Sequence, residues 1–138
     1  MSSKYFKAYE LVSKKDYEAL GPSKVFEIID PRLLASLDAI KEKFPNGSMY
    51  VNNWKWGLDR EWSGLRTPNS PYYSLGSMHS YGKAADFIFT DYTAAEVRKY
   101  IIDNPQEFPY VKGIENFKGM TWVHIDVRDS DSVVVFNG

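Results

Sequence analysis

Residues 77–89 read SMHSYGKAADFIF, a polar turn that runs directly into an apolar segment. The near-continuous apolar run at residues 84–89 is typical of a strand buried in a sheet. Gly82 allows the backbone to turn tightly just before this strand. Asp86 is the one charged residue in the run, and it requires a partner because burying an unpaired carboxylate is costly. The segment therefore predicts a buried strand with a partnered carboxylate.

Helices are predicted on both sides of this strand. Capping boxes at residues 13–16 (SKKD) and 93–96 (TAAE) each indicate a helix start, and Gly21-Pro22 is expected to end the first helix. Asp30-Pro31 indicates another start, because Asp is a preferred N-cap and Pro is favoured at the first helical position. This helix carries one apolar face, made by Leu33, Leu37, Ile40 and Phe44.

Four further segments have the character of strands. They are residues 48–54, 110–115, 121–127 and, as an edge strand, 132–136. Strands and helices that mix without strict alternation predict an α+β fold with a mainly antiparallel sheet and flanking helices.

Composition narrows the class of protein. The chain has 138 residues, of which 43% are hydrophobic and 25% charged, and no linker or repeat divides it, so a single domain over residues 1–138 is expected. The net charge of −1 and the lack of a basic run argue against a nucleic-acid partner. Because the chain has no cysteine, a metal site would use His, Asp or Glu.

A long irregular segment, residues 55–78, combines glycines, prolines and aromatic residues. Such a segment in a small domain is usually functional or disordered, and its aromatic content favours an ordered, functional one. Aromatic residues beside glycine often line peptide or carbohydrate grooves, although they are equally common in cores. Three tyrosines are expected at the rim of a substrate groove: Tyr72, Tyr73 and Tyr81.

The two histidines of the chain, His79 and His124, suggest a metal site. A catalytic zinc commonly has two imidazole ligands, one carboxylate and an open position for water. His79, Asp86 and His124 supply this set. Each has an ordinary explanation alone, such as a core histidine or an aspartate paired with arginine. Together they use every histidine, which favours the metal site.

These motifs resemble those of the M15 family of zinc peptidases. The pattern Ser-x-His-x-x-Gly-x-Ala-x-Asp at residues 77–86 and Trp-Val-His-x-Asp at residues 122–126 are similar to the family's metal-binding motifs. Residues 63–69, SGLRTPN, are similar to its Ser-Gly-x-Arg element. The family comprises D-Ala-D-Ala carboxypeptidases, dipeptidases and phage L-Ala-D-Glu endolysins, and shares its fold with the hedgehog signalling domain. The resemblance spans residues 62–128, about half the chain; residues before Tyr50 match no family pattern.

The resemblance implies roles for individual residues. One zinc ion would lie on His79, Asp86 and His124, and Ser77 would contact substrate. Arg66 would hold a substrate carbonyl or carboxylate. Guanidinium donors can independently be expected to stabilise the oxyanion that forms when water attacks an amide. The alternative for Arg66 is a structural salt bridge to one of two nearby acids, Asp59 or Glu61.

The general base stays open between two carboxylates. Many relatives place an acid three residues before the second zinc histidine, where this chain has Thr121, and others a histidine two before it, where it has Trp122. Asp126 is preferred because residues two apart on a strand share a face with each other, here with His124. It could equally orient that imidazole. Glu115 could face the site if the strand register suits.

The expected function is zinc-dependent hydrolysis of amide bonds in bacterial peptidoglycan peptides by a phage-type endolysin or murein endopeptidase. Alternatives are a D-Ala-D-Ala carboxypeptidase or dipeptidase, and a catalytically silent metal-binding domain of a phage structural protein. Residues 1–7 lack the apolar core of a signal peptide, and no stretch reaches transmembrane length. The protein is therefore expected to be a monomer made in the cytoplasm, without membrane insertion, that reaches the cell wall after release or within a virion.

Overall fold

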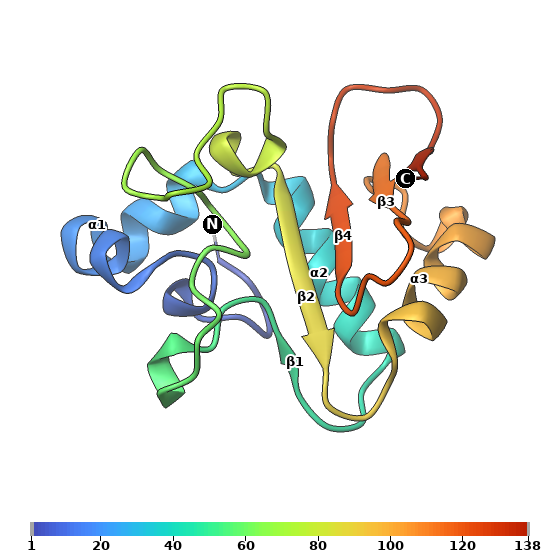
Figure 1. The fold of residues 1–138 in the computed structure, drawn as a ribbon, viewed down its shortest axis with the longest axis horizontal. Coiled ribbons are helices and arrows are strands. Elements are labelled where there is room, and N and C mark those ends of the chain that lie inside the picture. The colour runs from blue at the N-terminus through green and yellow to red at the C-terminus, as the bar shows by residue number, and fades with distance from the viewer. Residues whose placement is uncertain (1, 138) are drawn as a thin grey trace.

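A five-stranded mixed sheet forms the centre of the computed structural model, which describes residues 2–137 (Figure 1). The strands are β1 (Met49–Tyr50), β2 (Ala84–Phe89), β3 (Gly113–Glu115), β4 (Val123–Asp126) and β5 (Val134–Phe136), in the order β1-β2-β4-β3-β5. Neighbouring strands are antiparallel except β3 and β5, which run parallel. The predicted α+β class is confirmed, and β2 coincides with its predicted residues.

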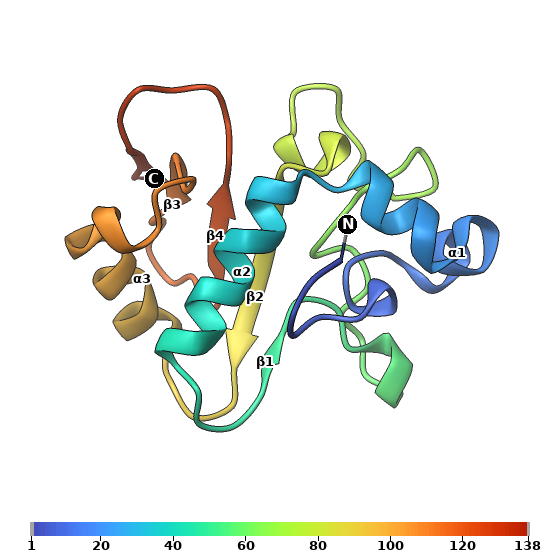
Figure 2. The ribbon, with the colours of Figure 1, turned by 180° about the vertical axis from the view of Figure 1, so that it is seen from behind.

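Three α-helices surround this sheet within residues 2–137: α1 (Lys14–Ile28), α2 (Pro31–Lys43) and α3 (Ala94–Asp103). Figure 2 shows α2 lying across the back of β2 and β4, while α1 and α3 lie at opposite ends of the molecule. Short 3-10 helices complete the fold: η1 (Ala8–Glu10), η2 (Trp54–Trp56), η3 (Met78–Tyr81) and η4 (Pro105–Glu107). None of the helices in the described residues is long and apolar enough to cross a membrane.

The helix starts follow the capping residues. Ser13 accepts a hydrogen bond from the backbone of Asp16, and the reciprocal capping box at Thr93 is present. The predicted end of the first helix is only partly right. Gly21, with φ of 77°, breaks the helical path, but the chain resumes a helix at once and continues to Ile28. Proline is favoured in a first helical turn, so Pro22 restarts the helix.

The strand faces divide the sheet into a core side and a polar side. Successive side chains on a strand point to opposite faces, and the core includes Phe87 of β2, Ile114 of β3 and Ile125 of β4 together with the apolar face of α2. On the same three strands, the positions next to these core residues carry Asp86, Glu115, His124 and Asp126. The polar side chains of three adjacent strands are therefore gathered on the face away from α2.

The irregular segment after η2 is tied to its neighbours by backbone hydrogen bonds. Leu65 donates to the carbonyl of Leu11 (2.8 Å), and Asp86 on β2 donates to the carbonyl of Ser63 (2.8 Å). β1 is much shorter than the predicted strand at residues 48–54, because the chain turns after Tyr50 to join these loop contacts. The segment is thus ordered and lies against the edge of the polar face.

Candidate metal centre

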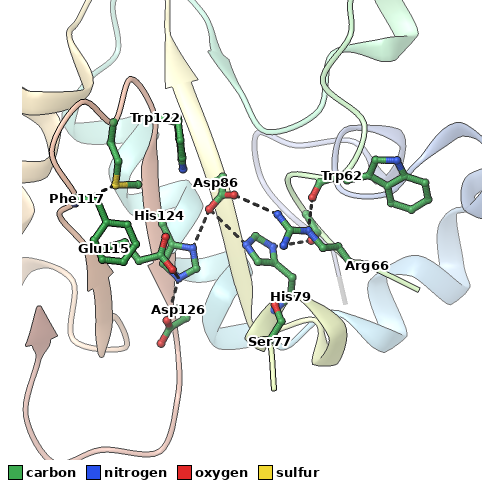
Figure 3. Close-up of polar contacts among 12 residues, drawn as sticks. Trp62, Arg66, Ser77, His79, Asp86, Glu115, Phe117, Trp122, His124 and Asp126 are labelled. Carbon is green, nitrogen blue, oxygen red and sulfur yellow. Dashed lines mark hydrogen bonds and ion pairs between the residues drawn. The ribbon is translucent and has the colours of Figure 1, made fainter. Parts of the chain in front are cut away.

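Three strands place ionisable side chains in one row. In the antiparallel ladders, His124 on β4 pairs with Asp86 on one side and with Glu115 on the other. Paired residues point to the same face of a sheet with their Cβ atoms about 5 Å apart. The register that the sequence left open therefore puts Glu115 beside His124 (Figure 3).

His79 reaches this row from η3, outside the sheet. The Ser77 hydroxyl caps η3 by accepting the backbone N–H of His79 (3.2 Å). Gly82 ends η3 in the left-handed conformation, with φ of 67°. A Cβ there would lie 2.9 Å from the carbonyl oxygen of Ile28, so only glycine fits this turn. The tight turn brings the His79 ring back over the start of β2.

The predicted metal ligands meet at one point. Asp86 Oδ1 lies 2.8 Å from His124 Nδ1 and 3.4 Å from His79 Nε2. One donor atom from each of the three residues lies within 4.8 Å of the others. Two donors held about 2.1 Å from one zinc ion in tetrahedral geometry are roughly 3.4 Å apart. The group can therefore hold a divalent metal ion, as the sequence predicted.

The second nitrogen of each imidazole is fixed by an acceptor. His79 Nδ1 lies 2.9 Å from the carbonyl oxygen of Gly64, which can only accept, so Nδ1 carries a proton and Nε2 is the nitrogen that would bind a metal. His124 Nε2 lies 3.0 Å from the Asp126 carboxylate and donates to it in the same way. Both ligating nitrogens thus face the metal position, because their ring partners set the tautomers.

Asp126 lies behind His124 and is 0% exposed. Arg128 donates to both of its oxygens, through Nε and Nη2, each at 2.6 Å. Gly113 lies opposite on β3, and a Cβ there would be 2.2 Å from Asp126 Oδ1, so the carboxylate occupies the space that glycine leaves. Burial raises the pKa of Asp126, but the hydrogen bonds from Arg128 and His124 outweigh it and lower that pKa to about 2. Asp126 is a fixed anion that orients the imidazole.

Glu115 has a different environment. It lines an open cavity of about 540 Å³ together with all three metal ligands. Its Oε2 lies 3.8 Å from His124 Nε2, and its side chain is 32% exposed. Both carboxylates predicted as the general base therefore lie near His124 Nε2, but Glu115 lines the cavity and the enclosed Asp126 does not.

Arg66 forms another wall of the cavity. Its Nε donates to the carbonyl of Trp62 (2.7 Å), and its Nη2 lies 3.4 Å from Asp86 Oδ2. The acid that Arg66 contacts is thus a metal ligand, distant in sequence, rather than the nearby Asp59 or Glu61. The guanidinium is held beside Asp86 and lines the cavity.

The remaining predicted substrate contacts differ in whether they line this cavity. Ser77 and Trp122 line it. Tyr72, 63% exposed, covers the Arg66 guanidinium at 5.7 Å from its ring centroid and lines an adjoining cavity. Tyr73 and Tyr81 are exposed outside the lining, and the Tyr81 hydroxyl donates to the carbonyl of Leu75 (2.6 Å). Of the three tyrosines expected at the rim, only Tyr72 lines a cavity beside the site.

Sequence reasoning did not single out Arg128, which lines the cavity and holds Asp126. The signal was present, because residues at alternate positions from His124 through Asp126 to Arg128 point to one side of an extended chain. It also passed over Gly113, whose importance depends on which residue of β4 lies opposite.

Two of the predicted metal ligands, His124 and Asp86, have pKa values shifted in opposite directions. Burial lowers the pKa of His124, but hydrogen bonds to Asp126 and Asp86 outweigh it and raise that pKa to about 9. Burial raises the pKa of Asp86, but hydrogen bonds from His124 and His79 hold it well below its ordinary value. A proton on His124 therefore takes the position of positive charge that a metal would otherwise fill.

This competition predicts a pH-dependent stability in chelator-treated protein. His124 keeps its proton up to about pH 9 when folded, whereas an unfolded histidine releases it near 6.5. The stabilisation is complete below pH 6.5, and the free energy of unfolding should fall by up to about 1.4 kcal/mol per pH unit between 6.5 and 9. Urea unfolding at fixed pH values measures the slope. His124→Gln should flatten it, and an equally steep slope in that variant would contradict the assignment.

The arrangement combines a three-ligand metal position, a carboxylate and a guanidinium in one open cavity. These groups suit the polarisation of a carbonyl and the movement of a proton. Comparisons of the chain with family models, curated proteins and solved structures found no match.

Proposed function

We propose that this protein is a zinc-dependent peptidase that hydrolyses amide bonds in bacterial peptidoglycan peptides. The observation that carries the proposal is the row of Asp86, His124 and Glu115 on adjacent strands, which lines one open cavity together with His79. The resemblance of residues 77–86 and 122–126 to M15 peptidase motifs gives the reaction class and, with it, a hedgehog-type fold as part of the proposal.

Each group has a separate task in this reaction. His79 Nε2, His124 Nδ1 and Asp86 Oδ1 would hold a zinc ion, which would supply a Lewis acid to polarise a carbonyl and make water more acidic. Glu115 accepts the proton of the attacking water and gives it to the leaving amine nitrogen. Arg66 donates hydrogen bonds to the carbonyl oxygen as negative charge develops there.

Glu115 is preferred over Asp126 as the proton carrier. A general base must reach the water that attacks the substrate, and Glu115 lines the cavity. Asp126 is enclosed, and Arg128 occupies both of its oxygens. An anion held this way suits the orientation of an imidazole better than the exchange of protons with substrate.

The cavity also favours a substrate class. Arg66 and Arg128 both line it, so two guanidinium groups border the cavity. Guanidinium groups pair well with carboxylates. A short peptide with free carboxylates, as in peptidoglycan stems, meets this requirement. Action by a phage-type endolysin released from the cytoplasm, or by a virion domain, fits such a substrate.

Digestion of purified sacculi tests the proposal. Zinc-loaded protein is expected to release soluble muropeptides whose masses reveal new amino termini within the stem or cross-link. Release of a single carboxy-terminal amino acid would instead indicate the D-Ala-D-Ala carboxypeptidase alternative. Sacculi that bind the zinc-loaded protein and remain chemically intact would indicate a catalytically silent metal-binding domain.

A further inference from the structure

Asp16 is a buried carboxylate at the start of α1 that has partners both nearby and far away in sequence. It is 3% exposed. The hydroxyl of Thr67 lies 2.9 Å from both of its oxygens, and the side-chain amide of Asn69 donates to one of them at 3.0 Å. The Ser13 hydroxyl donates to the other oxygen at 3.0 Å. One carboxylate therefore ties the loop directly after Arg66 to the first helix.

The residues just before Arg66 are tied to the same part of the chain. Leu65 donates its backbone N–H to the carbonyl of Leu11. The approach is so close at Gly64 that a Cβ would lie 2.2 Å from the Leu11 carbonyl oxygen. The N-terminal segment thus holds the Arg66 backbone from both sides.

Residues 64–66 make two hydrogen bonds with His79, one of the predicted metal ligands. The carbonyl of Gly64 accepts from His79 Nδ1, and the backbone N–H of Arg66 donates to the His79 carbonyl (3.1 Å). The Arg66 side chain lines the cavity, whereas Thr67 and Asp16 lie outside its lining. Any influence of Asp16 on the site must therefore pass through the position of this segment.

We propose that Asp16 is a positioning residue that fixes the Arg66 guanidinium beside the metal position through Thr67 and Asn69. A long arginine side chain has many rotamers, and a fixed backbone reduces those it can adopt. Misplacement of a catalytic group by about 1 Å can lower turnover by about 100-fold. The N-terminal segment, for which the sequence showed no family pattern, thereby becomes part of the working site.

The effect on turnover rests on the proposed function, but the position of Arg66 does not. Arg66 Nε–H donates to the Trp62 carbonyl, and such a bond slows hydrogen exchange of the Nε–H. The ¹H–¹⁵N spectrum of zinc-loaded protein, with the Arg66 signal assigned through Arg66→Lys, therefore reports on the guanidinium without any substrate.

The test compares Asp16→Asn and Thr67→Val with two controls. Both variants should accelerate exchange of the Arg66 Nε–H at least about tenfold and lower kcat/KM by about 10- to 100-fold. Thr67→Ser, which restores the hydroxyl, should recover both values. Thr90→Val removes a hydroxyl that also makes two hydrogen bonds, at the distant turn after β2, and should change only the melting temperature.

An unchanged Arg66 signal in folded Thr67→Val would overturn the proposal, whatever the activity. If Thr67→Val does not fold, Asn69→Ala replaces it, because Asn69 lies at an exposed loop position. An unchanged Arg66 signal in Asn69→Ala would then overturn the proposal. A shifted Arg66 signal in protein that cleaves no peptide would support the positioning role and count against the peptidase function alone.

Discussion

Replacing His79 with alanine should reduce bound zinc from about one ion per chain to a trace. The affinity for zinc should fall by more than about 100-fold. The loss should exceed the 10- to 100-fold typical of residues that only orient a ligand, because a direct donor is removed. The two remaining ligands, Asp86 and His124, already contact each other at 2.8 Å and can close into an ion pair. Elemental analysis and competition with a chelating dye measure both quantities.

Ser80→Ala is the matched control for this experiment. Ser80 is the next residue on η3, and its hydroxyl donates to the carbonyl of Ser74 rather than to the metal ligands. This variant should bind zinc like the unmodified protein. Equal zinc content in His79→Ala and the unmodified protein would refute the metal assignment, and with it the proposed chemistry.

Replacing Glu115 with glutamine should lower kcat by about 100- to 10,000-fold while zinc binding is retained. Glutamine has nearly the same shape but cannot take a proton from water. Asp126→Asn should give the opposite pattern, a zinc affinity about 10- to 100-fold lower with a smaller effect on kcat at saturating zinc. Steady-state hydrolysis of a soluble muropeptide, with zinc content measured in parallel, separates the two.

The reverse outcome would reassign the base. Full turnover in Glu115→Gln, together with loss of turnover in zinc-saturated Asp126→Asn, would return Asp126 to that role. The pair is informative because both carboxylates neighbour one imidazole, and only one of them lines the cavity.

Local signals predicted much of the fold. The apolar run of β2 and the caps of α2 and α3 depend on nearby residues alone, and each element begins where the sequence indicated. The short strands were overextended, because β1 ends where loop contacts replace the ladder. The helix restart after Gly21 was missed, since a glycine followed by proline indicates a helix end and a helix start equally well.

The site shows the same division. His79, Asp86 and His124 could be predicted because the chain has only two histidines and the spacing of the three residues forms a recognisable motif. The partner of Arg66 could not, since Asp86 reaches it only through the fold. Likewise, sharing a strand face with His124 did not reveal that Gly113 and Arg128 enclose Asp126, because both contacts depend on tertiary structure.

The parallel pairing of β5 with β3 affects which side chains of β3 face the cavity. β3 is only three residues long, and it keeps its alignment between β4 and β5, where Glu115 pairs with Phe136. A slip of one residue would exchange the faces of β3, sending Glu115 into the apolar core and Ile114 toward the cavity. The last strand therefore helps to keep Glu115, rather than Ile114, facing the cavity that the predicted metal ligands line.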